Sequence, residues 1–112
     1  MAVRNIVELT KDTFAFEALQ CCVPVMVSFW ADWCKPCLML RPLIEDLALE
    51  YEGQVKFATV NVDEQPELAS EYRISAVPTM VLFKDGEVQD VIVGLKGRSD
   101  LQSSLEKILT PA

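Results

Sequence analysis

The chain has 112 residues and a mass of 12.6 kDa, the size of one ordinary domain, with no room for a second. Its formal net charge of −7 and pI near 4.5 argue against nucleic acid and anionic membranes as partners, because both attract basic proteins. Hydrophobic residues make up 51% of the chain and no long polar tract interrupts them, so we expect residues 1–112 to form a single compact domain with protein partners.

The amino terminus and the cysteines bear on cellular location. Residues 1–5 lack the basic segment and apolar run of a signal peptide, and no hydrophobic run approaches the length of a membrane span. If this is the whole product, we expect a cytoplasmic monomer that contacts no membrane. In that reducing compartment four cysteines do not form a structural disulfide framework, so a Cys-x-x-Cys pair is catalytic, metal-binding or incidental.

Strand and helix patterns alternate through the first half of the chain. The predicted elements are a strand over 6–9, a helix from caps at 10–12 to about 22, a buried strand over 23–31 and an amphipathic helix over 34–51. Hydrophobic residues recur at intervals of three and four in the long helix, and Gly53 is expected to stop it. Pro42 lies inside it and predicts a bend.

The second half predicts three more strands and two helices. They are a strand over 55–62, a short helix from 64–66 to about 73, strands over 77–83 and 88–93, and a last helix begun by a capping box at 99–102 and ended by Pro111. Asp85-Gly86 between two hydrophobic alternations is typical of a hairpin turn. This order predicts an α/β fold with a mixed sheet and helices on both faces.

Two cysteines, Cys34 and Cys37, lie three residues apart at the start of the long helix. This spacing puts both on one face, close enough for their sulfurs to alternate between a disulfide and two thiols. The unpaired amides and positive dipole end of the helix favour the Cys34 thiolate by about 0.3–1 kcal/mol. Lys35 adds a positive charge, and Pro36 fixes the backbone where the turn begins. We therefore predict that Cys34 attacks and Cys37 resolves.

The sequence around this pair resembles thioredoxin, and the resemblance extends along nearly the whole chain. Residues 28–37 (SFWADWCKPC) resemble the active-site segment, residues 60–63 the third strand, and residues 77–79 and 83–86 the later hairpin. The resemblance implies the thioredoxin fold, with a mixed five-stranded sheet and about four flanking helices. It also implies reduction of protein disulfides by dithiol–disulfide exchange, with no metal and no organic cofactor. The implied partners are a thioredoxin reductase and disulfide-bearing proteins.

The resemblance further implies how substrates bind. Pro78 would be a cis proline that faces Cys34 and presents the backbone of Val77 to a substrate chain for β-type pairing. Gly94 falls where the family has a glycine. Trp33, Val77, Pro78 and Gly94 would form a flat apolar rim around the sulfurs, where substrates and the reductase dock in turn.

The sequence departs from the family pattern in three respects. Ser28 stands where the family usually carries a buried acid beneath the second cysteine, and Thr59 replaces the lysine often paired with that acid. A positioned base contributes about 10²- to 10⁴-fold, so this chain either gives up rate for stability or passes the proton through water held by Ser28. Lys35 replaces the commonest glycine and predicts a mild shift of the couple toward oxidising. Residues 75–76 are Ser-Ala rather than Arg-Gly, which leaves target preference open.

Other interpretations of individual residues stay open. Cys34 and Cys37 could join Cys21 and Cys22 in a four-cysteine metal site, although a strand between the two pairs would hold them about 20 Å apart. We interpret Cys21 and Cys22 as small buried or helix-end residues. Trp30 is expected to be a core aromatic residue, and Asp32 and Asp63 are expected to be solvated surface charges.

Two other functions use the same fold. An oxidase or isomerase would run the same cysteine chemistry in the other direction, and the redox potential separates it from a reductase. A binding module would hold a partner without turnover, an alternative that the missing acid keeps open although both cysteines are present.

Overall fold

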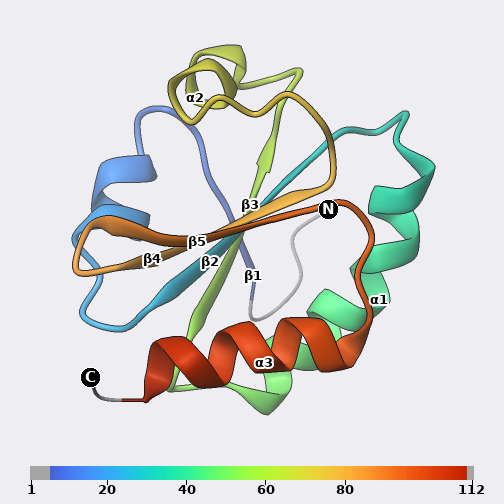
Figure 1. The fold of residues 1–112 in the computed structure, drawn as a ribbon. Coiled ribbons are helices and arrows are strands. Elements are labelled where there is room, and N and C mark those ends of the chain that lie inside the picture. Colours follow the sequence, from blue (N-terminus) through green and yellow to red (C-terminus); the bar gives the residue numbers. More distant parts are fainter. Residues whose placement is uncertain (1–5, 111–112) are drawn as a thin grey trace.

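The computed structural model describes residues 6–110 as one sheet with helices on both faces (Figure 1). Its strands are β1 (Ile6–Glu8), β2 (Val25–Trp30), β3 (Lys56–Asn61), β4 (Thr79–Lys84) and β5 (Glu87–Val93). Its helices are the π-helix η1 (Ala15–Leu19), α1 (Lys35–Glu50), α2 (Pro66–Glu71) and α3 (Arg98–Leu109). The strand order is β1-β3-β2-β4-β5, with β1, β3 and β2 parallel and β4 and β5 antiparallel. The expected mixed five-stranded sheet with four helices is confirmed.

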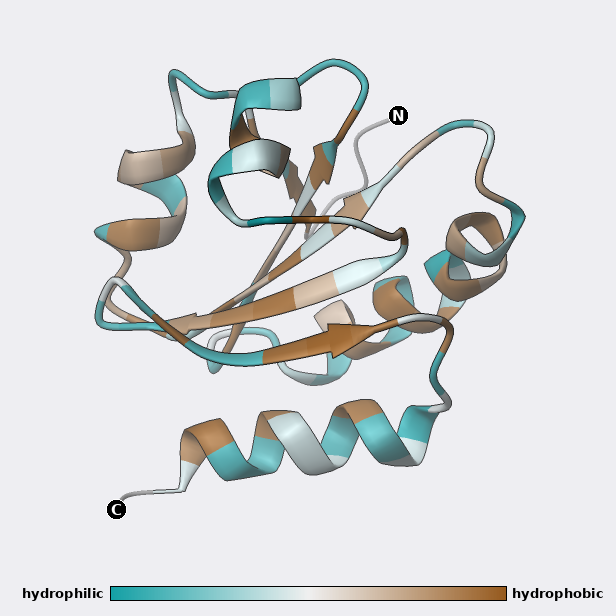
Figure 2. Cartoon of the chain, turned by 45° about the horizontal axis from the view of Figure 1, so that its top comes forward, coloured by the Kyte–Doolittle hydropathy of each residue, from teal (hydrophilic) through white to brown (hydrophobic). Residues whose placement is uncertain are grey.

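Each face of the sheet carries its own hydrophobic core, because successive strand residues point to opposite faces. On β2, Met26 packs in the core beneath α1 and α3, whereas Val25 and Val27 pack in the core beneath η1 and α2. Figure 2 shows the matching pattern on α3, where hydrophobic and hydrophilic residues alternate along the helix. Within residues 6–110 no helix is long and apolar enough to cross a membrane.

The first helix differs from its prediction. It is a short π-helix that ends at Leu19, so Cys21 and Cys22 follow it instead of ending it, the first half-buried and the second exposed. The amide of Gln20 donates to the carbonyl of Ala15, five residues back, at 3.0 Å. Phe16, which lies in this wider turn, is 72% exposed.

The helix α1 begins and continues largely as predicted. Cys34 is its N-cap, and Pro36 lies in the first turn, where the missing N–H has no helical partner to lose. The helix runs without a break through Pro42 and ends at Glu50, before Gly53, whose φ of +85° only a glycine adopts easily. The bend at Pro42 stays a prediction.

The last third of the chain gives one confirmed turn and one correction. Asp85 and Gly86 have φ of +55° and +80°, as expected of the two-residue turn between β4 and β5. The capping box predicted at 99–102 is wrong, because α3 begins at Arg98 with Gly97 as its N-cap. The Gly97 carbonyl already accepts from the amide of Leu101 at 3.3 Å, so the first turn starts earlier. Pro111, the predicted stop, lies outside the described residues.

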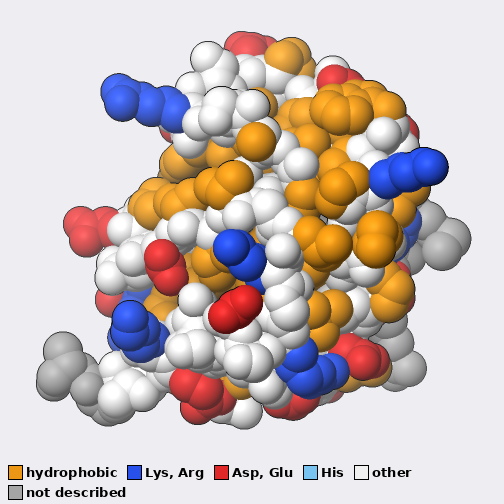
Figure 3. Space-filling model, turned by 45° about the vertical axis from the view of Figure 1, so that its right-hand side comes forward, with side chains coloured by type: hydrophobic (Ala, Val, Ile, Leu, Met, Phe, Trp, Pro, Cys, Tyr) orange, Lys and Arg blue, Asp and Glu red, His pale blue; other side chains and the backbone are white. Residues whose placement is uncertain are grey.

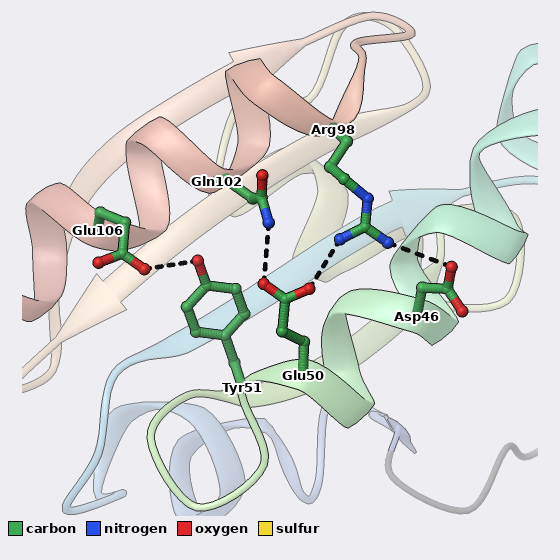
Figure 4. Close-up of polar contacts among 6 residues, drawn as sticks. All are labelled: Asp46, Glu50, Tyr51, Arg98, Gln102 and Glu106. Atoms are coloured by element: carbon green, nitrogen blue, oxygen red, sulfur yellow. Dashed lines mark hydrogen bonds and ion pairs between the residues drawn. The ribbon is translucent and has the colours of Figure 1, made fainter.

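A polar network ties the carboxyl half of α1 to α3 (Figure 4). The Arg98 guanidinium contacts Glu50 at 2.8 Å and Asp46 at 3.2 Å, and the Gln102 amide donates to Glu50 at 2.8 Å. Beyond the helix end, the hydroxyl of Tyr51 donates to the Glu106 carboxylate at 2.6 Å. Burial, and then the bond to Glu106, raise the pKa of Tyr51 to about 12.

Candidate active site at the start of helix α1

The two predicted redox cysteines meet at the amino end of α1. Strand β2 and the short turn after it deliver the chain to Cys34, and Cys37 follows one helical turn later. Their sulfurs form a disulfide, with the two Cα atoms 5.3 Å apart. The side chains are nearly buried, at 3% and 6% exposed, and they pack with Ala31, Trp30 and Val77.

Backbone groups surround the sulfur of Cys34. The amide of Cys37 donates to Cys34 Sγ at 3.2 Å, and the carbonyl oxygen of Val77 lies 3.6 Å from the same atom. The Val77–Pro78 peptide bond is cis, as predicted. An N–H aimed at the sulfur from a helix start stabilises a thiolate more than a thiol, so the amino end of α1 suits an attacking sulfur at Cys34.

Trp33 lies beside the sulfurs and is held by a residue we had not assigned to the site. Its side chain is 69% exposed, and its indole N–H donates to a carboxylate oxygen of Asp63 at 2.8 Å. Asp63 is exposed, as expected, and it also accepts this hydrogen bond from Trp33. No sequence pattern linked residues 33 and 63, since the contact joins two loops. Asp32 is exposed, as expected.

The remaining predicted rim residues lie around Pro78. Pro78 is buried, Val77 is half-buried, and the amide of Gly94 donates to the Pro78 carbonyl at 2.8 Å. On α1, Leu38 and Met39 add exposed apolar surface, 47% and 67% exposed. In Figure 3, where the side of the molecule that carries α1 is turned forward, hydrophobic side chains gather into a broad patch. Lys35 and Pro36 are exposed.

Comparison with known proteins decides the family. A family model described as Thioredoxin matches residues 5–107. The chain is 44% identical over 102 residues to Thioredoxin 1 of Nostoc sp., which covers 91% of this chain and 95% of that protein. It is 42% identical over 99 residues to Thioredoxin of Rickettsia felis, a match that covers 88% of this chain and 94% of that protein. It is 40% identical over 110 residues to Thioredoxin M-type, chloroplastic, of Spinacia oleracea, a match that covers 98% of this chain and 61% of that protein. The chain belongs to the thioredoxin family.

Membership confirms the expected thioredoxin fold and the expected activity. The protein is a thiol–disulfide oxidoreductase that acts on protein disulfides by dithiol–disulfide exchange, with the Cys34–Cys37 pair as its redox-active disulfide. The pair sits at a helix start and packs in a small cluster of its own, separate from the core beneath α1.

This thioredoxin has a cavity beneath Cys37, at the position where the family usually carries its acid. The cavity measures about 50 Å³, and Ser28 and Thr59, directly paired on β2 and β3, both line it. Its lining residues are Ile6, Glu8, Ser28, Trp30, Cys37, Leu38, Leu40, Arg41, Ile44 and Thr59. Ser28 is 6% exposed, so a serine hydroxyl lies where a carboxylate would be buried.

Trp30 is more than a core aromatic residue. It is only half-buried, lines the cavity, and carries a buried indole N–H that has no hydrogen-bond partner among residues 6–110. Buried donors of this kind are usually paired with protein or with ordered water. The sequence did not indicate that the indole N–H of Trp30 would be unpaired. It also did not indicate that Glu8 and Arg41 would line the same cavity.

The other two cysteines lie apart from the site. Cys21 and Cys22 precede β2, whereas Cys34 and Cys37 follow it, so the length of that strand separates the two pairs. Among residues 6–110, no three His, Cys, Asp or Glu side chains come together in a way that could hold a metal ion.

Proposed function

We propose that this protein works as a disulfide reductase in which Cys34 is the nucleophile and Cys37 the resolving thiol. The Cys34 thiolate attacks one sulfur of a substrate disulfide and forms a mixed disulfide, releasing the other substrate sulfur as a thiolate. Cys37 then loses its proton and attacks Cys34 Sγ, which releases the second substrate sulfur. The substrate gains two electrons, and the protein is left with the Cys34–Cys37 disulfide.

One observation supports this division of roles. The amide of Cys37 donates to the sulfur of Cys34, while Cys34 itself occupies the N-cap of α1. The donor favours negative charge on Cys34, and so favours the thiolate that attacks the substrate disulfide. Lys35, exposed beside it, adds a weak, screened contribution of the same sign, and Pro36 holds the first turn.

Substrate binding is assigned to the rim formed by Trp33, Val77, Pro78 and Gly94. The Val77 carbonyl lies beside Cys34, where an extended substrate segment can pair with the backbone on either side of its disulfide. Trp33, fixed through Asp63, offers an exposed apolar surface next to the same sulfur. Flat apolar contact with backbone pairing suits many unrelated disulfide-bearing proteins better than one specific partner.

The proposal extends to the electron donor and the location. A thioredoxin reductase would return electrons to the Cys34–Cys37 disulfide, and the protein would act as a cytoplasmic monomer without metal or organic cofactor. Membership of the family supports the reductase as electron donor, and the net charge of −7 supports protein partners over nucleic acid and anionic membranes.

The test compares single cysteine variants in the reduction of a disulfide-bonded protein. Cys34→Ser and Cys37→Ser should each abolish turnover, and the Cys37→Ser variant should trap substrate as a mixed disulfide that thiols release. Cys22→Ser, which removes an exposed cysteine outside the site, serves as the control and should keep full activity. Turnover that survives either Cys34→Ser or Cys37→Ser would overturn the assignment. A partner bound equally well by both variants, without turnover in the parent, would favour a binding module.

A further inference from the structure

The cavity beneath Cys37 has a carboxylate at its edge. Glu8, the last residue of β1, lines it together with Cys37. Glu8 pairs with Thr59 across β1 and β3, and Thr59 pairs with Ser28 across β3 and β2. Neighbouring strands lie about 4.8 Å apart, so Glu8 and Ser28 are about 10 Å apart across the sheet, with Thr59 between them.

These three residues share one face of the sheet. Residues two positions earlier on the same strands belong to the core beneath α1 and α3; they are Ile6, Phe57 and Met26. Because strand side chains alternate, residues two positions apart point to the same side. The row of carboxylate and two hydroxyls therefore runs beneath α1, toward Cys37, and all three of its residues line the cavity.

The cavity lining has the groups that a proton relay needs. A volume of about 50 Å³ has room for water, and water needs polar partners to stay. The hydroxyls of Ser28 and Thr59 each donate and accept, and the unpartnered indole N–H of Trp30 supplies a further buried donor. A chain of hydroxyls and water passes a proton by donating at one end while accepting at the other.

We propose that Glu8 is the proton acceptor for Cys37, reached through Ser28, Thr59 and water in the cavity. The inference rests on the proposed function, in which Cys37 resolves the mixed disulfide. In that step the thiol proton of Cys37 passes along the row to the Glu8 carboxylate. The Cys37 sulfur bonds to Cys34 as the bond between Cys34 and the substrate sulfur breaks. The substrate sulfur leaves as a thiolate, which takes its proton from solvent.

The charges around the row fit this role. Arg41 of α1 lines the same cavity and pairs with Glu45 at 3.4 Å. Among the described cavity residues Glu8 and Arg41 are the charged ones, and the chain has no histidine to act instead. Glu8 is exposed, so it can return the proton to solvent between turnovers.

The test separates the two steps of exchange in one experiment. The reduced protein, with Cys21 and Cys22 replaced by serine, is mixed with dithiobis(nitrobenzoate), and the coloured thiolate is followed in rapid mixing across pH. The first release reports attack by Cys34 and the second reports resolution by Cys37. A parent protein that gives no second release contradicts the proposed function itself, independently of Glu8.

Glu8→Gln should slow the second release about tenfold at neutral pH and leave the first release unchanged, since an acceptor acting through water contributes less than the 10²- to 10⁴-fold of a directly placed base. The loss should shrink as pH rises, because solvent then takes the thiol proton unaided. Glu8→Asp, which keeps the carboxylate, should restore most of the rate. Ser28→Ala and Thr59→Val, which interrupt the row, should reproduce the loss.

Glu87→Gln provides the matched control, because it makes the same charge change at an exposed position on β5, outside the cavity. It should leave both releases unchanged. A second release in Glu8→Gln within twofold of the parent at every pH would overturn the inference. An equal loss in Glu87→Gln would also overturn it, because general charge and not Glu8 would then set the rate.

Discussion

At its amino end α1 carries two reactive sulfurs, exposed apolar side chains and a cavity, whereas at its carboxyl end it is joined to α3 by ion pairs and hydrogen bonds. Near Cys37, the buried N–H of Trp30 has no partner among the described residues. Near Glu50, one carboxylate takes donors from both Arg98 and Gln102. Both ends belong to α1 and pack on the same core. The helix is therefore fixed to α3 at its carboxyl end and carries the reactive cysteines at its amino end.

In this thioredoxin, stability and activity therefore depend on different ends of α1. Core residues along α1, among them Leu40, Ile44 and Leu47, hold the helix against the sheet and belong to a different cluster from Cys34 and Cys37. The polar network joins the carboxyl end of α1 to α3. Substitutions at the carboxyl end of α1 should therefore change stability alone. Substitutions beneath Cys37 should change both the rate of disulfide reduction and stability.

The largest effect is expected from restoring a carboxylate at the reactive end. Ser28→Asp should raise the rate of disulfide reduction about tenfold at neutral pH, because it places an acid beneath Cys37, and it should make Glu8 dispensable. Burying the carboxyl should lower the free energy of unfolding by on the order of 2 kcal/mol. Turnover assays and thermal melts measure the two effects.

Ser28→Asn is the matched control for that change, since it adds similar bulk and polarity without an acid. It should not raise the rate. Unchanged or lower turnover in Ser28→Asp would contradict the idea that a missing carboxylate beneath Cys37 limits the rate.

At the anchored end, Tyr51 should make stability depend on alkaline pH. Its pKa is raised to about 12 by burial first and then by its bond to Glu106, against the ordinary value of 10.0. The raised pKa means that the folded state holds this proton more tightly than the unfolded chain does. The contribution is therefore complete below about pH 10 and is lost as pH rises toward about 12, on the order of 2 kcal/mol in all.

The variant that isolates this effect is Tyr51→Phe. The difference in free energy of unfolding between the parent and the variant, measured by urea unfolding, should stay constant from neutral pH to about pH 9 and then shrink. A difference that stays flat through pH 12 would contradict the role given to this hydroxyl.

Breaking the ion-pair network should have a smaller effect, confined to stability. Arg98→Ala removes the contacts to Glu50 and Asp46 and should lower the free energy of unfolding by about 1 kcal/mol, the upper range for exposed pairs. Lys11→Ala, which removes a single exposed pair with Glu67, is the control and should cost less than about 0.5 kcal/mol. The rate of disulfide reduction should not change in either variant. A slower rate in Arg98→Ala would show that the two ends are coupled.

The smallest effect is expected at Lys35. Its exposed charge next to Cys34 is screened by solvent, so Lys35→Gly should make the couple more reducing by only ~10 mV. Equilibration with glutathione measures the shift. An unaltered potential would make this lysine a bystander.

Much of the fold was predictable because its signals are local. Hydrophobic periodicity located every strand to within about two residues, and Asp85-Gly86 identified the hairpin through residues that tolerate positive φ. The errors came where local signals compete. The first helix was predicted to reach about residue 22 but ends at Leu19, and Ser99 resembled a cap although Gly97 is the N-cap of the last helix.

The residues of the site that are close together in the sequence were predictable from it. Those brought together from distant loops and strands were not. Cys34 and Cys37 are three residues apart in the sequence, so their spacing alone predicted a redox-active pair. The link between Trp33 and Asp63 depends on how two loops meet, and the position of Glu8 depends on the register of β1, β3 and β2. A single sequence does not show register between strands that are far apart in the chain.

The redox equilibrium of the Cys34–Cys37 pair distinguishes a reductase from an isomerase or oxidase. The purified protein is equilibrated against glutathione mixtures, and the fraction of closed disulfide is read by thiol alkylation. We expect one two-electron transition near −270 mV, the potential of a thioredoxin that acts as a reductant, and we expect it to disappear in Cys37→Ser. A transition near −180 mV or higher, as in an isomerase or oxidase, would contradict this expectation, and so would the absence of any transition.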